Sequence, residues 1–143
     1  MDPTYERGLR EAVENEPFAR KLGLELTDVD EGYARVEMVF DPETMGNIYG
    51  MTHGGAIFSL MDEAFQAASN SHGNIAVALN VSITYVAAPK PGERLQAEAT
   101  LAAMTRKTAT YDLKATGEEG RLLAKALATV YRLDKKPPFA EQT

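Results

Sequence analysis

The feature that most constrains the fold is one strongly apolar helical segment, residues 56–71 (AIFSLMDEAFQAASNS). It contains no Gly or Pro, and at about 100° per residue its polar side chains fall within an arc of roughly 100°. These polar residues are Ser59, Asp62, Glu63, Gln66 and Asn70. Because apolar side chains cover the rest of its circumference, the helix should be buried on one broad face, and another layer of structure must cover it.

A series of strand-like segments can supply that layer. Residues 33–40 alternate, which predicts a half-buried strand whose inward side chains are Ala34, Val36, Met38 and Phe40. After the helix come four segments rich in Val, Ile, Thr, Tyr and Leu: residues 75–86, 94–104, 107–116 and 121–133. Turn signals separate them at residues 89–92, 105–106 and 117–120. Four successive strands with tight connections predict an antiparallel meander.

These elements together predict an α+β fold in which an antiparallel β-sheet wraps around one long central α-helix. The 143 residues fit a single domain, 1–143, which can bury roughly 68–70% of the surface exposed by the unfolded chain. A short amphipathic helix is expected at residues 4–15. Pro137-Pro138 is expected to end the ordered part, before a loose C-terminal tail.

The charge and the residue types exclude several classes of function. A net charge of -6 and a pI near 5.0 argue against a nucleic-acid partner, because such proteins need a basic face. The absence of Cys removes disulfides, thiolate nucleophiles and Cys-type metal sites. No apolar run nears the roughly 20 residues of a membrane-spanning helix, so no membrane association and a cytoplasmic location are expected.

Five short motifs resemble the hotdog-fold acyl-CoA thioesterases of the phenylacetic-acid-degradation type. They are residues 47–55 (NIYGMTHGG), 60–65 (LMDEAF), 70–73 (NSHG), 82–85 (SITY) and 89–93 (PKPGE). Asn47 lies seven residues before Gly54 and Asp62 eight after it, as in that family. The resemblance covers about residues 16–133, the expected core of the domain. It implies a hotdog fold, hydrolysis of acyl-CoA thioesters, and no cofactor.

Gly54 and Gly55 begin the central helix, where backbone N–H groups are unpaired and the helix dipole is positive. Such donors can bind a developing oxyanion, and Gly lets the substrate approach the backbone closely. The alternative is that the pair only shapes a loop-to-helix turn. The family pattern favours Gly54 as the group that polarises the thioester carbonyl, with Gly55 beside it in the binding site.

Asp62 lies at the border between the polar arc and the apolar face, where partial desolvation could raise its basicity. It would act as a general base on water or attack the carbonyl itself. The alternative is that Asp62 and Glu63 are only the solvated edge of an amphipathic helix. The family match favours the catalytic role.

Eight residues of helix place Asp62 about 12 Å from Gly54 along the axis. If both act on one bond, Asp62 must therefore come from a second subunit, an arrangement that the resemblance implies. We expect a homodimer that assembles into a homotetramer.

The remaining site predictions are less specific. Asn47 could hold the attacking water or orient the carboxylate, or could simply form a turn. His53 could donate a hydrogen bond that fixes the loop; no metal site is expected, and His72 is expected at a surface turn. An apolar acyl pocket near Tyr49, Phe58, Met61 and Phe65 would suit aryl or medium-chain groups. The candidates for contact with the CoA phosphates are Lys90, Arg106 and Lys107.

Two other functions compete with hydrolysis. A non-catalytic acyl-CoA-binding module would keep the fold without a base, which the presence of Asp62 argues against. A hotdog dehydratase would need a His paired with a carboxylate at another spacing. The acyl group, and the choice between CoA and acyl carrier protein, stay open at this point.

Overall fold

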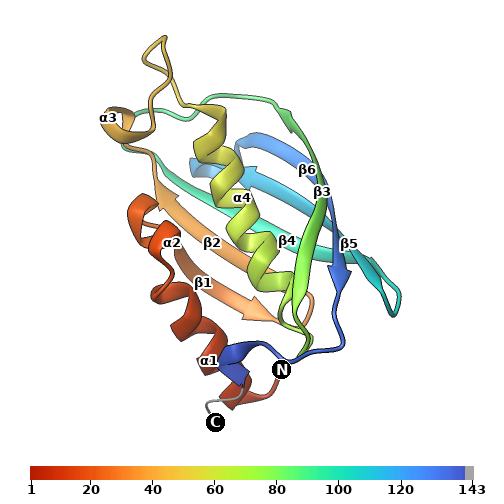
Figure 1. The fold of residues 1–143 in the computed structure, drawn as a ribbon. Helices are drawn as coiled ribbons and strands as arrows, with labels where there is room; N and C mark the ends of the chain where they lie inside the picture. The colour runs from red at the N-terminus through yellow and green to blue at the C-terminus, as the bar shows by residue number, and fades with distance from the viewer. Residues whose placement is uncertain (141–143) are drawn as a thin grey trace.

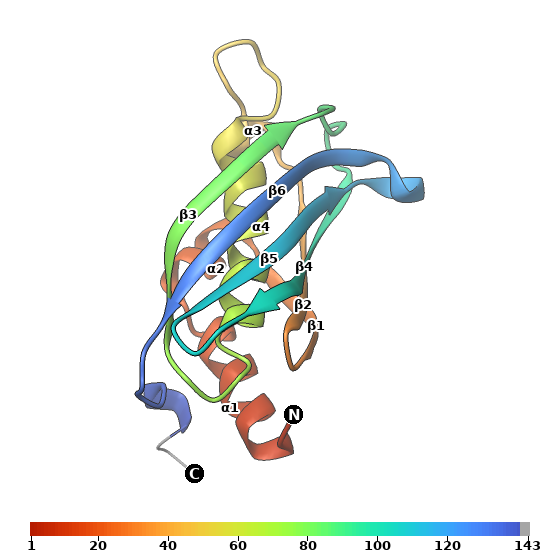
Figure 2. The same cartoon turned by 90° about the vertical axis from the view of Figure 1, so that its right-hand side faces the viewer.

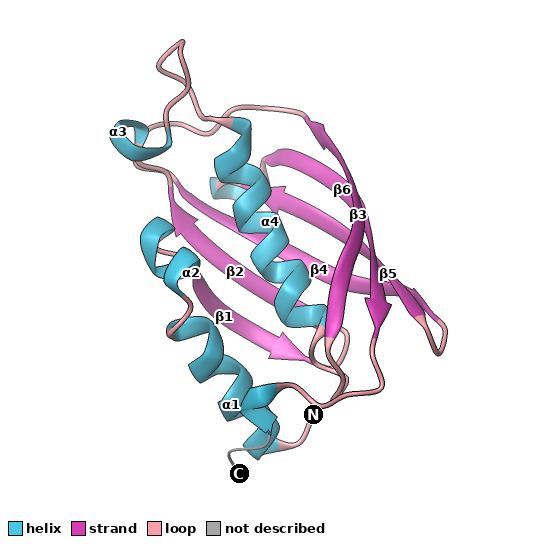
Figure 3. Ribbon diagram, in the orientation of Figure 1, coloured by secondary structure: helices cyan, strands magenta, loops and turns pink. Residues whose placement is uncertain are grey.

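The computed structural model describes residues 1–140, which form a six-stranded antiparallel sheet curved around one long helix (Figures 1 and 3). The strands are β1 (Glu25–Asp30), β2 (Tyr33–Val39), β3 (Ala76–Tyr85), β4 (Arg94–Met104), β5 (Thr108–Thr116) and β6 (Leu122–Arg132). The α-helices are α1 (Pro3–Glu14), α2 (Pro17–Leu22), α3 (Pro42–Met45) and α4 (Gly54–Ser69), and two short 3₁₀ turns are η1 (Glu118–Gly120) and η2 (Pro138–Ala140).

Helix α4 is the central helix that its apolar face predicted. It packs on the inner face of the sheet, against β2, β4 and β5 above all. The predicted inward side chains of β2 are all buried there: Ala34, Val36, Met38 and Phe40. Much of the facing surface is alanine, including Ala97, Ala99, Ala115 and Ala128, so the helix can approach the sheet closely. The predicted α+β hotdog architecture is confirmed.

The order of the strands differs from the expected meander. The order in the sheet is β1-β2-β4-β5-β6-β3, so β3 pairs with β6 at one edge and not with β4, the next strand in the chain. The connection between β3 and β4 is not a tight turn, because residues 86–93 cross the end of the molecule that carries the start of α4 (Figure 1). An alternating pattern indicates which side of a strand is buried, but not which strand lies beside it.

Strand β1 was not predicted. It pairs with β2 through a bulge between Leu26 and Asp28, which interrupts the alternation. Its acidic residues, Glu25, Asp28 and Asp30, further weaken the usual strand signal.

The two ends of the described chain meet at the end of the molecule opposite the loop before α4 (Figure 2). Helix α1 matches the expected N-terminal helix and buries Leu9 and Val13. Order continues past Pro137, because Phe139 of η2 packs edge-on against Tyr5 with ring centroids 5.3 Å apart. The loose tail expected after Pro138 is thus absent up to residue 140, and residues 141–143 lie outside the described part. Within residues 1–140, no helix is long and apolar enough to cross a membrane.

Candidate active site

The first turn of α4 presents one free backbone donor. His53 is the N-cap residue, and its Nδ1 accepts a hydrogen bond from the Gly55 N–H at 2.8 Å. His53 therefore acts as an acceptor here, and not as the donor expected from the sequence. Among residues 1–140, the Gly54 N–H has no hydrogen-bond partner. Of the two glycines, Gly54 is thus the one whose N–H is available to an oxyanion.

Tyr85, at the end of β3, holds this turn from the side. Its hydroxyl donates to the Gly54 carbonyl oxygen at 3.0 Å. A Cβ on Gly54 would lie 3.1 Å from Tyr85 Cζ, and one on Gly55 would lie 2.9 Å from His53 Nδ1. Both positions therefore favour glycine for lack of space. Tyr85 belongs to a motif of the sequence, but nothing in that motif indicated which turn of which helix it would contact.

Asn47 shapes the loop that leads into α4. Its side-chain oxygen accepts hydrogen bonds from the backbone N–H groups of Tyr49 (2.9 Å) and Met51 (3.0 Å). Its amide nitrogen makes only a long contact of 3.4 Å with the Thr52 carbonyl. The side-chain oxygen of Asn47 therefore stabilises the turn, as the alternative interpretation expected, whereas its amide nitrogen is only weakly hydrogen-bonded.

Asp62 presents a carboxylate without a partner. Its side chain is half-buried, and among the described residues it makes no hydrogen bond or ion pair. Burial raises the pKa of Asp62, and the negative charge of Glu16 raises it further. A carboxylate in this state is a stronger base than an exposed one.

Gly54 and Asp62 are not brought together within one chain. Both lie on the continuous helix α4, so about 12 Å of helix axis separates them, as the sequence spacing predicted. Chemistry on a single carbonyl cannot use both groups of the same chain.

Comparison with known proteins decides the family. A family model described as the thioesterase superfamily matches residues 49–124. A protein from Archaeoglobus fulgidus with a proposed esterase function is 44% identical over 124 residues, which cover 87% of this chain and 80% of that protein. The chain belongs to the thioesterase superfamily.

Two further relatives refine the assignment. The acyl-coenzyme A thioesterase PaaI of Escherichia coli is 33% identical over 111 residues, covering 78% of this chain and 79% of PaaI. The solved structure of the E. coli PaaI protein superposes with a TM-score of 0.87 at 29% identity, over 93% of this chain and 96% of that one. A Streptococcus mutans protein solved with acetyl CoA gives a TM-score of 0.74 at 29% identity, over 80% and 91% of the two chains. This chain is therefore a thioesterase of the PaaI type, as its motifs predicted.

The predicted acyl-pocket residues of this thioesterase are spread over different environments. Phe65 and Met61 are fully buried in the core, where Phe65 packs edge-on against Tyr111 with centroids 5.7 Å apart. Phe58 is half-buried, and Tyr49 is exposed on the loop before α4. Of these residues, only Phe58 and Tyr49 have surface that a substrate could reach in the protomer.

The predicted phosphate-contact residues of the thioesterase lie at opposite ends of the sheet. Lys90 lies in the β3–β4 connection, at the end that carries the start of α4 (Figure 1). Arg106 and Lys107 lie in the β4–β5 turn at the other end, where both approach Asp134, at 3.5 and 3.9 Å. One CoA molecule bound to a single chain could therefore not meet all three.

His72 is not the surface turn residue that the sequence suggested. Only 5% of its side chain is exposed, its Nε2 lies 3.0 Å from the Tyr111 hydroxyl, and its Nδ1 lies 3.5 Å from Glu31 Oε1. The residue follows the C-terminal end of α4, far from Gly54, and its burial leaves no room for a substrate. This His–carboxylate pair therefore gives no support to a dehydratase.

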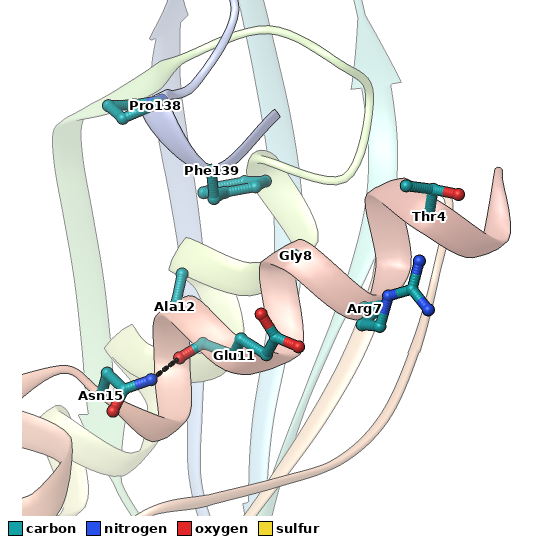
Figure 4. Close-up of a pocket in the computed structure, with 8 residues that line it drawn as sticks. All are labelled: Thr4, Arg7, Gly8, Glu11, Ala12, Asn15, Pro138 and Phe139. Carbon is teal, nitrogen blue, oxygen red and sulfur yellow. Dashed lines mark hydrogen bonds between the residues drawn. The ribbon is translucent and has the colours of Figure 1, made fainter. Parts of the chain in front are cut away.

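Two hollows on the thioesterase surface differ in their relation to the site. A hollow of about 210 Å³ lies between α2 and the first turn of α4; its lining includes Phe18, Leu22, Met45, His53 and Gly55. A larger groove of about 790 Å³ lies between α1 and η2, lined by Arg7, Glu11 and Phe139 among others (Figure 4). Only the first reaches the start of α4, where His53 and Gly55 line it on either side of Gly54 in the sequence. No group of three or more His, Asp or Glu side chains within residues 1–140 could hold a metal ion.

Proposed function

We propose that this thioesterase hydrolyses acyl-CoA thioesters, with Asp62 as general base or nucleophile and the Gly54 N–H polarising the carbonyl. The observation that carries the proposal is the pair of unengaged groups on α4: a free N–H at its first turn and an unpaired carboxylate of raised pKa two turns on. The names of the relatives support CoA as the carrier, since E. coli PaaI is an acyl-coenzyme A thioesterase and the S. mutans protein binds acetyl CoA.

These groups are enough for thioester hydrolysis. Asp62 takes a proton from water while the water oxygen attacks the carbonyl carbon. The oxyanion that develops on the carbonyl oxygen accepts a hydrogen bond from the Gly54 N–H. The C–S bond then breaks, and the departing thiolate takes the proton from the Asp62 carboxylic acid, which leaves the free acid and CoA. If Asp62 attacks directly, the C–S bond breaks to release the CoA thiolate, and the intermediate is a mixed anhydride. Water hydrolyses this anhydride to the free acid and the Asp62 carboxylic acid, whose proton the thiolate takes.

The site requires a second copy of the chain. Strand β3 has a partner on one side only, and its exposed side chains include Val77, Leu79 and Tyr85. An open apolar edge favours pairing with another strand. Antiparallel pairing of two β3 strands would set the two α4 helices side by side in opposite directions, so that Asp62 of one approaches Gly54 of the other. A homodimer built in this way, and its assembly into a homotetramer, are parts of the proposal.

The substrate would lie across the subunit boundary. Phe58, exposed Tyr49 and the hollow beside Gly55 are apolar surfaces suited to an aryl or medium-chain acyl group. His53 would orient the first turn, Asn47 would hold water through its weakly engaged amide nitrogen, and Phe65 would support Phe58's helix from the core. Lys90 of one subunit and Arg106 and Lys107 of another are proposed phosphate contacts. The single domain and the cytoplasmic location stay predictions from the sequence.

The test is thiol release from phenylacetyl-, benzoyl- and straight-chain acyl-CoAs by the native protein and by Asp62→Asn. We expect kcat to fall roughly 10²–10⁴-fold in Asp62→Asn on every substrate, while acyl-CoA binding survives. Asp112→Asn is the matched control, because Asp112 is exposed on β5. Full activity in Asp62→Asn would refute the catalytic role. Binding without turnover by the native protein would favour an acyl-CoA-binding module instead.

A further inference from the structure

Three carboxyl groups gather beside the middle of α4. Glu16 precedes α2, and Asp62 and Glu63 lie on α4 itself. Glu63 is only 4% exposed, although the sequence places it on the polar arc of the helix. The Gln66 amide nitrogen donates to Glu16 Oε2 at 2.6 Å and to Glu63 Oε1 at 3.2 Å. The Gln66 side chain thus ties Glu16, from the connection between α1 and α2, to the buried Glu63 of α4.

No positive charge neutralises this carboxyl cluster of Glu16, Asp62 and Glu63. Within residues 1–140, none of the three forms an ion pair. The nearby cation Arg20 of α2 is committed to the Glu14 carbonyl and the Asn15 side chain.

The other titratable groups that face α4 lie elsewhere along it. Lys21 of α2 lines the hollow at the first turn, where Tyr85 of β3 binds Gly54. Tyr111 of β5 contacts the Ala68 carbonyl near the last turn. The inward residues of β2 and β4 are apolar. Glu16 is therefore the charge from outside α4 that acts on Asp62.

Burial and the neighbouring charges leave the cluster with an uneven distribution of protons. Burial raises the pKa of Glu63 to about 8, with further contributions from Glu16 and Asp62, so Glu63 is the group that keeps a proton at neutral pH. Burial is also the main cause of the raised pKa of Asp62, and Glu16 is its second cause.

We propose that Glu16 is a positioning residue for the reaction at Asp62: it holds Glu63 as a neutral acid and sets a negative charge beside Asp62, which strengthens Asp62 as the proton acceptor. The inference rests on the proposed catalytic role of Asp62. It gives the short connection between α1 and α2 a part in the chemistry of a helix that follows it by some forty residues in the sequence.

The experiment is the pH profile of kcat/KM for the native protein and Glu16→Gln, with Glu11→Gln as the control because Glu11 is exposed on α1. The acid limb of this profile reports the pKa of the essential base in the free enzyme. Without the charge of Glu16, Asp62 becomes a weaker base, so we expect the acid limb to move to lower pH, while burial of Asp62 still keeps it above the pKa of an exposed carboxyl group. Glu11→Gln should leave the limb in place. A direct titration of the Asp62 carboxyl by NMR should show the same shift.

The outcomes separate this inference from the proposed function. An unchanged acid limb in Glu16→Gln, or a uniform loss of kcat without a shift, overturns the positioning role while leaving Asp62 as the base. Retained activity in Asp62→Asn overturns the proposed function itself.

Discussion

Glu63 is a carboxyl group that folding removes from water, and its effect on stability should depend on pH. Its pKa in the folded chain is about 8, against about 4.3 in an unfolded chain. Below the pKa of the unfolded chain, Glu63 is protonated in both the folded and the unfolded state, so no stability is lost through its ionisation. As the pH rises toward 8, the unfolded chain releases the proton and the folded chain keeps it, so stability is lost.

Glu63→Gln replaces this acid by a neutral side chain of the same shape. Relative to the native protein, its free energy of unfolding should rise by about 1–3 kcal/mol between pH 5 and pH 8. Urea unfolding at both pH values, at one protein concentration, measures the difference, and exposed Glu119→Gln serves as the control. The same difference at both pH values would show that Glu63 is ionised in the folded protein.

Strand β3 is the element on which assembly should depend. Leu79 is 60% exposed on this edge strand, so a Lys there is tolerated in the single chain but places two like charges together if two β3 edges pair. We expect Leu79→Lys to lower the molar mass measured by light scattering to that of a monomer, and to abolish thiol release. Leu127→Lys, on neighbouring β6 and 51% exposed, is the matched control and should stay at least dimeric. An active Leu79→Lys oligomer would place the interface elsewhere.

For the whole molecule, the decisive question is whether one active site draws on two chains. Gly54→Pro removes the free N–H and is compatible with the backbone of α4: Pro suits the first position of a helix, and the preceding His53 has the extended backbone (ψ 131°) that a following Pro requires. The Tyr85 ring, whose Cζ would lie 3.1 Å from the new Cβ, must shift by a few tenths of an ångström to make room. Alone, this variant should lose about 10²–10³-fold in kcat.

Co-expression of Gly54→Pro with Asp62→Asn tests the shared site. In a mixed dimer one site would combine an intact Gly54 from one chain with an intact Asp62 from the other, so each mixed dimer should recover about half of the native activity. Each variant alone is the control. If both groups acted within a single chain, every site in the mixed dimer would be defective and no activity would return.

Much of the fold and part of the site followed from the sequence by itself. The alternation of Ala34, Val36 and Met38 and the single apolar arc of residues 56–71 encode which faces are buried, because strands repeat every two residues and helices every 3.6. The motif spacing indicated the family, and it placed Gly54 at the start of the helix and Asp62 two turns on.

Only the tertiary structure decided which groups meet. The pairing of β3 with β6, the hydrogen bond of Tyr85 with Gly54, and the hydrogen bond of Gln66 with Glu16 join residues that are more than thirty positions apart. The tertiary structure also decided that the Gly55 N–H donates to His53, while the Gly54 N–H stays free among the described residues. Periodicity records the environment of a residue along its own element, whereas these contacts depend on how separate elements pack, which no local pattern contains.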